Sequence, residues 1–202
     1  MISNTSFRIS RFIQCKGQLH DFSNPKIMGI LNMTPDSFYE KSRQSVNEDL
    51  ISTVSTMIQA GADIIDIGAS STRPGAETPS ASEEISRLQD VFQLLRQAFP
   101  DIILSIDTFY GEVADYALTQ GADIVNDISG GQFDSELWNV VSKHQSPYIL
   151  TYHRGEKSNA GTSYIQKFQD GFFGIFPKKS PNWKKEACII SFWILVLVLG
   201  NP

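Results

Sequence analysis

The sequence contains very little cysteine: Cys15 and Cys188 are the only two among 202 residues. Two cysteines do not make the disulfide framework of a small secreted protein, and neither lies in a Cys/His cluster with zinc spacing. The amino-terminal residues also lack the apolar core of a signal peptide, because Arg8 and Arg11 interrupt it. We therefore expect a cytoplasmic protein without a zinc site.

Positive charge is also scarce. The chain has 17 Lys and Arg against 22 Asp and Glu, a net charge of −5, and no basic stripe, which argues against a nucleic-acid partner. It shows no Ser/His or Cys/His constellation typical of covalent catalysis. Its 202 residues can bury a sizeable core but fall short of the roughly 250 that a complete β/α barrel usually needs.

Short, β-branched apolar segments alternate with segments of helical spacing. Uninterrupted apolar runs are typical of parallel strands buried on both faces. A weak repeat, in which residues 59–67 resemble 119–128, supports repeated strand–helix units. The sequence therefore predicts an α/β fold of the TIM (β/α)8 barrel family with about the first five βα units present. The expected strands are 26–32, 62–68, 102–106, 123–126 and 147–152, and the expected helices are 48–60, 82–99, 112–120 and 135–143. Residues 1–25 are expected to be an entry segment, with a hairpin closing the barrel bottom.

Polar residues follow each of the first four predicted strands: Asn32, the 71–74 segment, Asp107 and Asn126. The carboxyl ends of barrel strands meet at the face where such enzymes keep their active sites. Taken singly, an Asn after a strand can be a turn former and Asp107 can be a helix cap. Their joint placement favours a functional site, in which Asp107 would accept hydrogen bonds from an N–H-rich planar ring.

Four motifs at these positions, residues 32–38, 68–76, 105–108 and 126–130, resemble dihydropteroate synthase, a pterin-binding enzyme of folate biosynthesis. The resemblance covers about residues 15–155. It implies a transferase that joins 4-aminobenzoate to 6-hydroxymethyl-7,8-dihydropterin diphosphate and releases diphosphate, with Mg²⁺. It also implies that sulfonamides compete for the site, that the full-length family forms homodimers, and that no membrane is involved.

The resemblance assigns roles residue by residue. Asn32 would hold the metal and the diphosphate. Asp36 and Asp107 would be the catalytic residues, Asp36 from a first loop that covers the reacting carbon. His153 is at the site rim or structural. The implied substrate-binding residues are Ser37, Phe38, Thr72, Arg73, Pro74, Asp107, Asn126 and Ile128.

The character of the chain changes after about Phe176. An apolar run of 13 residues, 187–199, is too short for a membrane span, since helix over that length covers about 20 Å against a core of ~30 Å. It can also be read as a buried strand or helix. A third interpretation is a one-base loss in an adenine run at Lys178–Ser180, because the forced codons of Phe192–Ile194 and Asn182–Lys184 agree with a shifted frame.

On that third interpretation the chain divides into 1–179, an incomplete pterin-binding barrel, and 180–202, a frameshifted apolar tail. We then expect the chain as written to fold poorly and to be inactive alone, because an open barrel leaves strand edges unpaired. Two other functions stay open. One is a non-catalytic pterin-binding fragment or pseudogene product, and the other is a methyltetrahydrofolate-using methyltransferase with a similar pterin-binding barrel.

Overall fold

In the computed structural model, the described residues are 12–15, 17–33, 43–70, 78–150 and 195–197. Their strands are β1 (Phe12–Cys15), β2 (Gln18–Asp21), β3 (Ile27–Asn32), β4 (Ile64–Gly68), β5 (Ile103–Asp107), β6 (Ile124–Asp127), β7 (Tyr148–Leu150) and β8 (Leu195–Leu197). Their helices are α2 (Arg43–Gln59), α3 (Ala81–Arg87), α4 (Val91–Ala98), α5 (Gly111–Gln120) and α6 (Glu136–His144).

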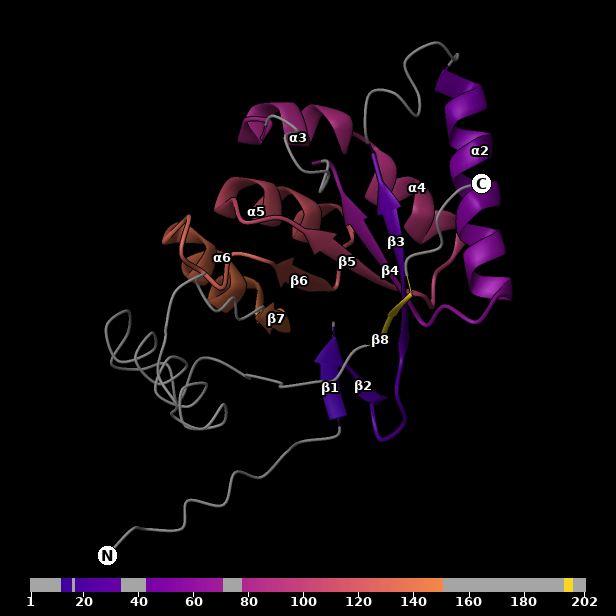
Figure 1. The fold of residues 1–202 in the computed structure, drawn as a ribbon, viewed down its shortest axis with the longest axis horizontal. Coiled ribbons are helices and arrows are strands. Elements are labelled where there is room, and N and C mark those ends of the chain that lie inside the picture. The colour runs from indigo at the N-terminus through magenta and orange to yellow at the C-terminus, as the bar shows by residue number, and fades with distance from the viewer. Residues whose placement is uncertain (1–11, 16, 34–42, 71–77, 151–194, 198–202) are drawn as a thin grey trace, which may run out of the picture.

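The main sheet is parallel throughout and has the strand order β7-β6-β5-β4-β3-β8. Consecutive strands β3 to β7 are neighbours, and helices α2 to α6 lie on one side of them (Figure 1). This arrangement confirms the predicted α/β architecture of strand–helix units. Among the described strands, β7 and β8 form the two ends of the sheet.

The segment before the main sheet forms the expected hairpin. Strands β1 and β2 pair antiparallel, and Figure 1 shows them beyond the ends at which the main strands begin. Ile13 and Cys15 of the hairpin pack with residues near the amino ends of β3 to β6, namely Met28, Ile64, Ile103 and Ile124. The hairpin thus covers the amino ends of β3 to β6 on the inward side of the sheet, the side that faces away from the helices.

Side chains alternate across the sheet, as the pleat requires. In β4, Ile65 and Ile67 belong to the large core under the helices, whereas Ile64 belongs to the cluster with the hairpin. Asp66 and Gly68 therefore share the inward side with Ile64. The same alternation in β5 and β6 places Ser105, Asp107 and Asn126 on the inward side.

Two helix predictions differ from the structure. The predicted helix 82–99 is two helices, because Asp90 takes a left-handed conformation with φ 65° between α3 and α4. Ser80 caps α3 through a capping box with Glu83, in which each side chain bonds the other residue's backbone N–H.

The first helix begins five residues earlier than the predicted 48–60. Val46 extends the apolar stripe one turn back from Leu50, and no glycine or proline interrupts residues 43–48.

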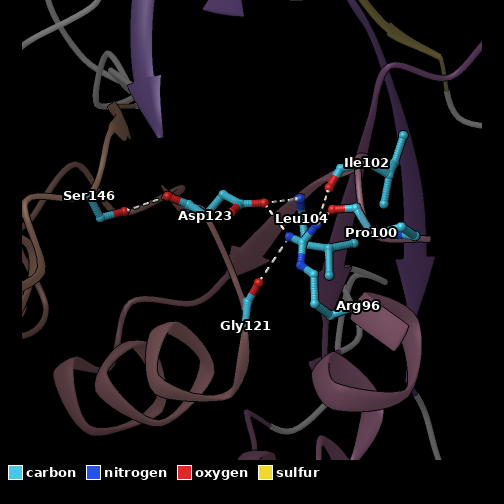
Figure 2. A network of polar contacts seen from close by, with 7 residues as sticks. All are labelled: Arg96, Pro100, Ile102, Leu104, Gly121, Asp123 and Ser146. Atoms are coloured by element: carbon cyan, nitrogen blue, oxygen red, sulfur yellow. Dashed lines mark hydrogen bonds and ion pairs between the residues drawn. The ribbon is translucent and has the colours of Figure 1, made fainter. Parts of the chain in front are cut away.

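A polar network ties together the amino ends of β5 and β6, far from the carboxyl ends (Figure 2). The guanidinium of Arg96 donates to the carbonyls of Pro100, Ile102 and Gly121 at 2.8, 2.7 and 3.0 Å, and it pairs with the Asp123 carboxylate. The same carboxylate accepts the backbone N–H of Leu104 at 2.9 Å. These contacts fix the α4–β5 and α5–β6 connections. They stabilise the barrel at the amino ends of its strands, away from the carboxyl ends.

The apolar tail contributes a strand to the fold. Residues 195–197 form β8, which pairs in parallel with Ile27–Gly29 of β3. This agrees with the interpretation of the run as strand or helix, while the domain division at 179/180 and the frame change stay predictions. No helix within the described ranges is both long and apolar enough to cross a membrane.

Candidate functional site

The polar residues that end the strands are neighbours in the sheet. The register pairs Asn32 with Gly68, Gly68 with Asp107, and Asp107 with Asn126. These four positions thus form one row across the carboxyl ends of β3 to β6. Asn32, Asp107 and Asn126 thus lie at neighbouring strand ends, as their positions in the sequence predict, and the roles assigned to them stay predictions.

Gly68 lets the two flanking side chains lie over it. A Cβ added to Gly68 would be 3.5 Å from Asp107 Oδ2 and 3.6 Å from Asn32 Oδ1. The oxygens of Asn32 and Asp107 therefore face the same small space above β4. Sequence reasoning treated this glycine as part of a motif and did not assign it a role, although glycine inside a strand often marks such a close approach.

Asp107 does not cap the following helix. Helix α5 has Tyr110 at its N-cap position and no side-chain cap. Within the part of the chain that the structure describes, the Asp107 carboxylate makes no hydrogen bond, although it is mostly buried. A buried carboxylate without a protein partner is available to a ligand, because such groups are normally satisfied.

The electrostatic environment keeps Asp107 partly protonated near neutral pH. Burial, and then the charges of Asp66, Glu84 and Asp127, raise the pKa of Asp107 to about 7. Glu84 is itself buried on α3, where burial raises its pKa, and its carboxylate accepts a 3.0 Å hydrogen bond from Thr108 Oγ1. A ligand with two N–H donors would bind the ionised form of Asp107 and so reduce the free-energy cost of its buried charge.

Asn126 lies beside Asp107, and its side-chain amide is hydrogen-bonded to a residue one layer deeper in the sheet. Its Nδ2 donates to Asp66 Oδ2 at 2.8 Å across the intervening strand β5. Its Oδ1 has no hydrogen-bond partner among the described residues and is not fully buried. The amide of Asn126 therefore offers an acceptor next to the carboxylate of Asp107.

Ile128 is presented by a tight turn after β6. The carboxylate of Asp127 accepts the backbone N–H of Ser129 and of Gly131, both at 2.6 Å, and also the hydroxyl of Tyr148. Ile128 is left 40% exposed next to Asn126. An exposed β-branched side chain beside two acceptors suits the face of a flat ring whose edge carries donors.

Two buried polar residues of this side were missed by sequence reasoning. Asp66 and Ser105 lie in the middle of β4 and β5, one layer below the row of strand ends. The sequence does show a charged or hydroxyl residue inside each β-branched run, two positions before Gly68 and Asp107 and therefore on the same face of the strand. The other predicted residues, Asp36, Ser37, Phe38, Thr72, Arg73, Pro74 and His153, lie outside the described residues.

The donors suit magnesium only in part. The oxygens of Asn32 and Asp107 are the hard ligands that Mg²⁺ prefers. Within the described ranges, however, no group of three or more His, Cys, Asp or Glu could hold a metal ion. A Mg²⁺ here would need further oxygens from phosphate or water, which is its usual mode of binding in phosphate-transfer sites.

The family model of pterin binding enzymes matches residues 28–170, which include the whole row of strand ends. The chain belongs to the pterin-binding enzyme family. Over 129 residues it is 51% identical to the dihydropteroate synthase of Synechocystis, covering 64% of this chain and 44% of that protein.

Solved structures agree with this membership. A dihydropteroate synthase of Clostridium difficile, solved in the presence of pteroic acid, has a TM-score of 0.67 and 34% identity over 78% of this chain and 59% of that one. The Yersinia pestis dihydropteroate synthase, solved as a sulfonamide drug complex, has a TM-score of 0.68 and 31% identity over 83% and 61%. The fold is therefore that of the family's β/α barrel, and the chain spans less than two thirds of each of these relatives.

Proposed function

We propose that the row of strand ends binds a pterin ring. The observation that carries this proposal is a pair of neighbouring acceptors, the Asp107 carboxylate and Asn126 Oδ1, which have no hydrogen-bond partner among the described residues. The edge of a pterin carries amino and ring N–H donors, which two adjacent acceptors can bind in plane. Ile128 beside them would then pack on the face of the ring.

The reaction proposed for the whole protein is dihydropteroate synthesis. The C–O bond between the pterin methylene and the diphosphate breaks, and a C–N bond to the amine of 4-aminobenzoate forms with loss of a proton. The Asp107 carboxylate lies where it would stabilise positive charge that develops on the pterin. Pteroic acid, with which the Clostridium relative was solved, contains both halves of such a product.

The remaining assignments extend this proposal by family resemblance. Asn32 would hold Mg²⁺, which when bound would neutralise the diphosphate. Asp36, Ser37 and Phe38 would cover the reacting carbon. Thr72, Arg73 and Pro74 would contact the diphosphate and the 4-aminobenzoate, and sulfonamides would compete for that place. A homodimer and a cytoplasmic location belong to the same proposal.

The function is tested by incubating the purified chain with pterin diphosphate, 4-aminobenzoate and Mg²⁺, and measuring diphosphate release. Release that requires 4-aminobenzoate and is blocked by a sulfonamide supports the transferase. Pterin binding without release, even with both substrates, assigns a non-catalytic pterin-binding protein. Absence of pterin binding contradicts the proposal.

A further inference from the structure

Asp66 is a charged residue in the interior of a sheet, where a carboxylate is costly. It is 3% exposed, and burial raises its pKa although the Ser105 hydroxyl and the Asn126 amide act in the opposite direction. Its Oδ1 and the Oγ of the adjacent Ser105 are both buried, and neither has a hydrogen-bond partner among the described residues. Unsatisfied buried atoms of this kind reduce stability, so the presence of a carboxyl here calls for a reason beyond packing.

Among the described residues, Asp66 accepts a side-chain hydrogen bond from a residue at the carboxyl end of β6. Asn126 Nδ2 donates to Asp66 Oδ2 at 2.8 Å, although 60 residues separate the two in the chain. An amide has donors on one side and an acceptor on the other, so a partner for Nδ2 decides where Oδ1 lies. Without an acceptor at position 66, the amide of Asn126 could turn and present N–H groups beside Asp107.

We propose that Asp66 is a positioning residue, which orients the Asn126 amide so that its Oδ1 accepts from the ligand beside Asp107. This inference rests on the proposed pterin site and deepens it. It assigns the donor-rich edge of the ring to the space above β5 and β6. Asp66 itself acts through Asn126 and lies one layer below the row of strand ends.

Two substitutions separate the hydrogen bond from the charge. Asp66→Asn and Asp66→Leu both remove the carboxylate and keep a side chain branched at Cγ, but only Asn retains an acceptor for Asn126 Nδ2. Ser105→Ala is the matched control, because Ser105 is as buried and on the same side but makes no hydrogen bond with Asn126. The probe is 6-hydroxymethylpterin, whose binding is followed by its fluorescence.

The expected pattern is specific to positioning. Asp66→Asn and Ser105→Ala should bind within about threefold of the wild type, and Asp66→Leu about tenfold more weakly. Asp66→Leu combined with Asn126→Ala should bind no more weakly than Asn126→Ala alone, because both changes remove the same oriented acceptor. Additive losses, or equal losses in Asp66→Asn and Asp66→Leu, would overturn the inference.

A second measurement does not need the ligand. Proton exchange at the Asn126 side-chain amide, followed by NMR, should be slow in the wild type and in Asp66→Asn, and fast in Asp66→Leu. Unchanged exchange in a folded Asp66→Leu would overturn the role of Asp66. Failure of the wild type to bind the pterin, with the exchange pattern as expected, would instead overturn the proposed function.

Discussion

Replacing Asp107 by Asn should stabilise the protein at high pH. Burial and three neighbouring carboxylates raise the pKa of Asp107 from 3.8 to about 7, which amounts to about 4 kcal/mol of unfavourable free energy for the ionised folded form. Asn has the same shape and no charge. Because Asp107 makes no hydrogen bond among the described residues, the substitution removes the penalty without removing a contact.

The pH dependence gives the sign of the effect. The folded-state pKa is raised, so between about pH 4 and pH 7 the folded protein holds a proton that the unfolded chain has lost, and stability falls as the pH rises. Near pH 4 the folded carboxyl is protonated and the unfolded one, with a pKa of 3.8, is only partly ionised, so the penalty is small. The gain from Asp107→Asn should therefore be below about 1 kcal/mol at pH 4 and approach about 4 kcal/mol at pH 8.5.

Urea denaturation of the wild type and Asp107→Asn at the two pH values measures this difference. Asp101→Asn is the control, because it removes one negative charge from an exposed turn and should leave the curve unchanged. An equal gain at both pH values, or a loss of stability at pH 8.5, would refute the account of Asp107 as a carboxylate held in an unfavourable place.

Three further outcomes are expected. Gly68→Ala should fold as well as the wild type, since the added methyl makes ordinary contacts at 3.5 and 3.6 Å. It should weaken pterin binding by about tenfold, because the methyl fills the space between Asn32 and Asp107. Equal binding in a fluorescence titration contradicts this. Arg96→Met should lower the free energy of unfolding in urea by about 3 kcal/mol and leave pterin affinity unchanged; weakened binding would contradict the separation of this network from the site. Resequencing the codons for residues 178–202 should reveal one additional adenine, and an unchanged sequence refutes the predicted frame change.

Much of the fold follows from local patterns. All five strands predicted for the barrel appear at β3 to β7, because uninterrupted β-branched runs fit a sheet covered on both sides. The division of the predicted helix 82–99 into α3 and α4 could not be predicted from the sequence, since Leu88 and Val91 continue the apolar stripe through the break. The break shows in the left-handed backbone at Asp90, the N-cap of α4, which no local pattern marks.

The site was predicted in part for a related reason. Asn32, Asp107 and Asn126 follow strand ends, so the topology alone brings them to one row. Asp66 and Ser105 do not follow a strand end. They lie on the inward side because side chains alternate along β4 and β5 and the register aligns the two strands. The raised pKa of Asp107 depends first on its burial and then on carboxylates from β4, α3 and β6, and no single segment of the sequence specifies either.

The central claim is that Asp107 and Asn126 form a pterin site on the inward side of the sheet. Calorimetric titration of 6-hydroxymethylpterin into the wild type and Asp107→Asn at pH 8 tests it most directly. The account predicts binding to the wild type and at least about tenfold weaker binding to Asp107→Asn, because the amide has one acceptor oxygen in place of two and cannot accept two parallel N–H bonds. Equal affinity of two folded proteins, or no binding to the wild type, would contradict it.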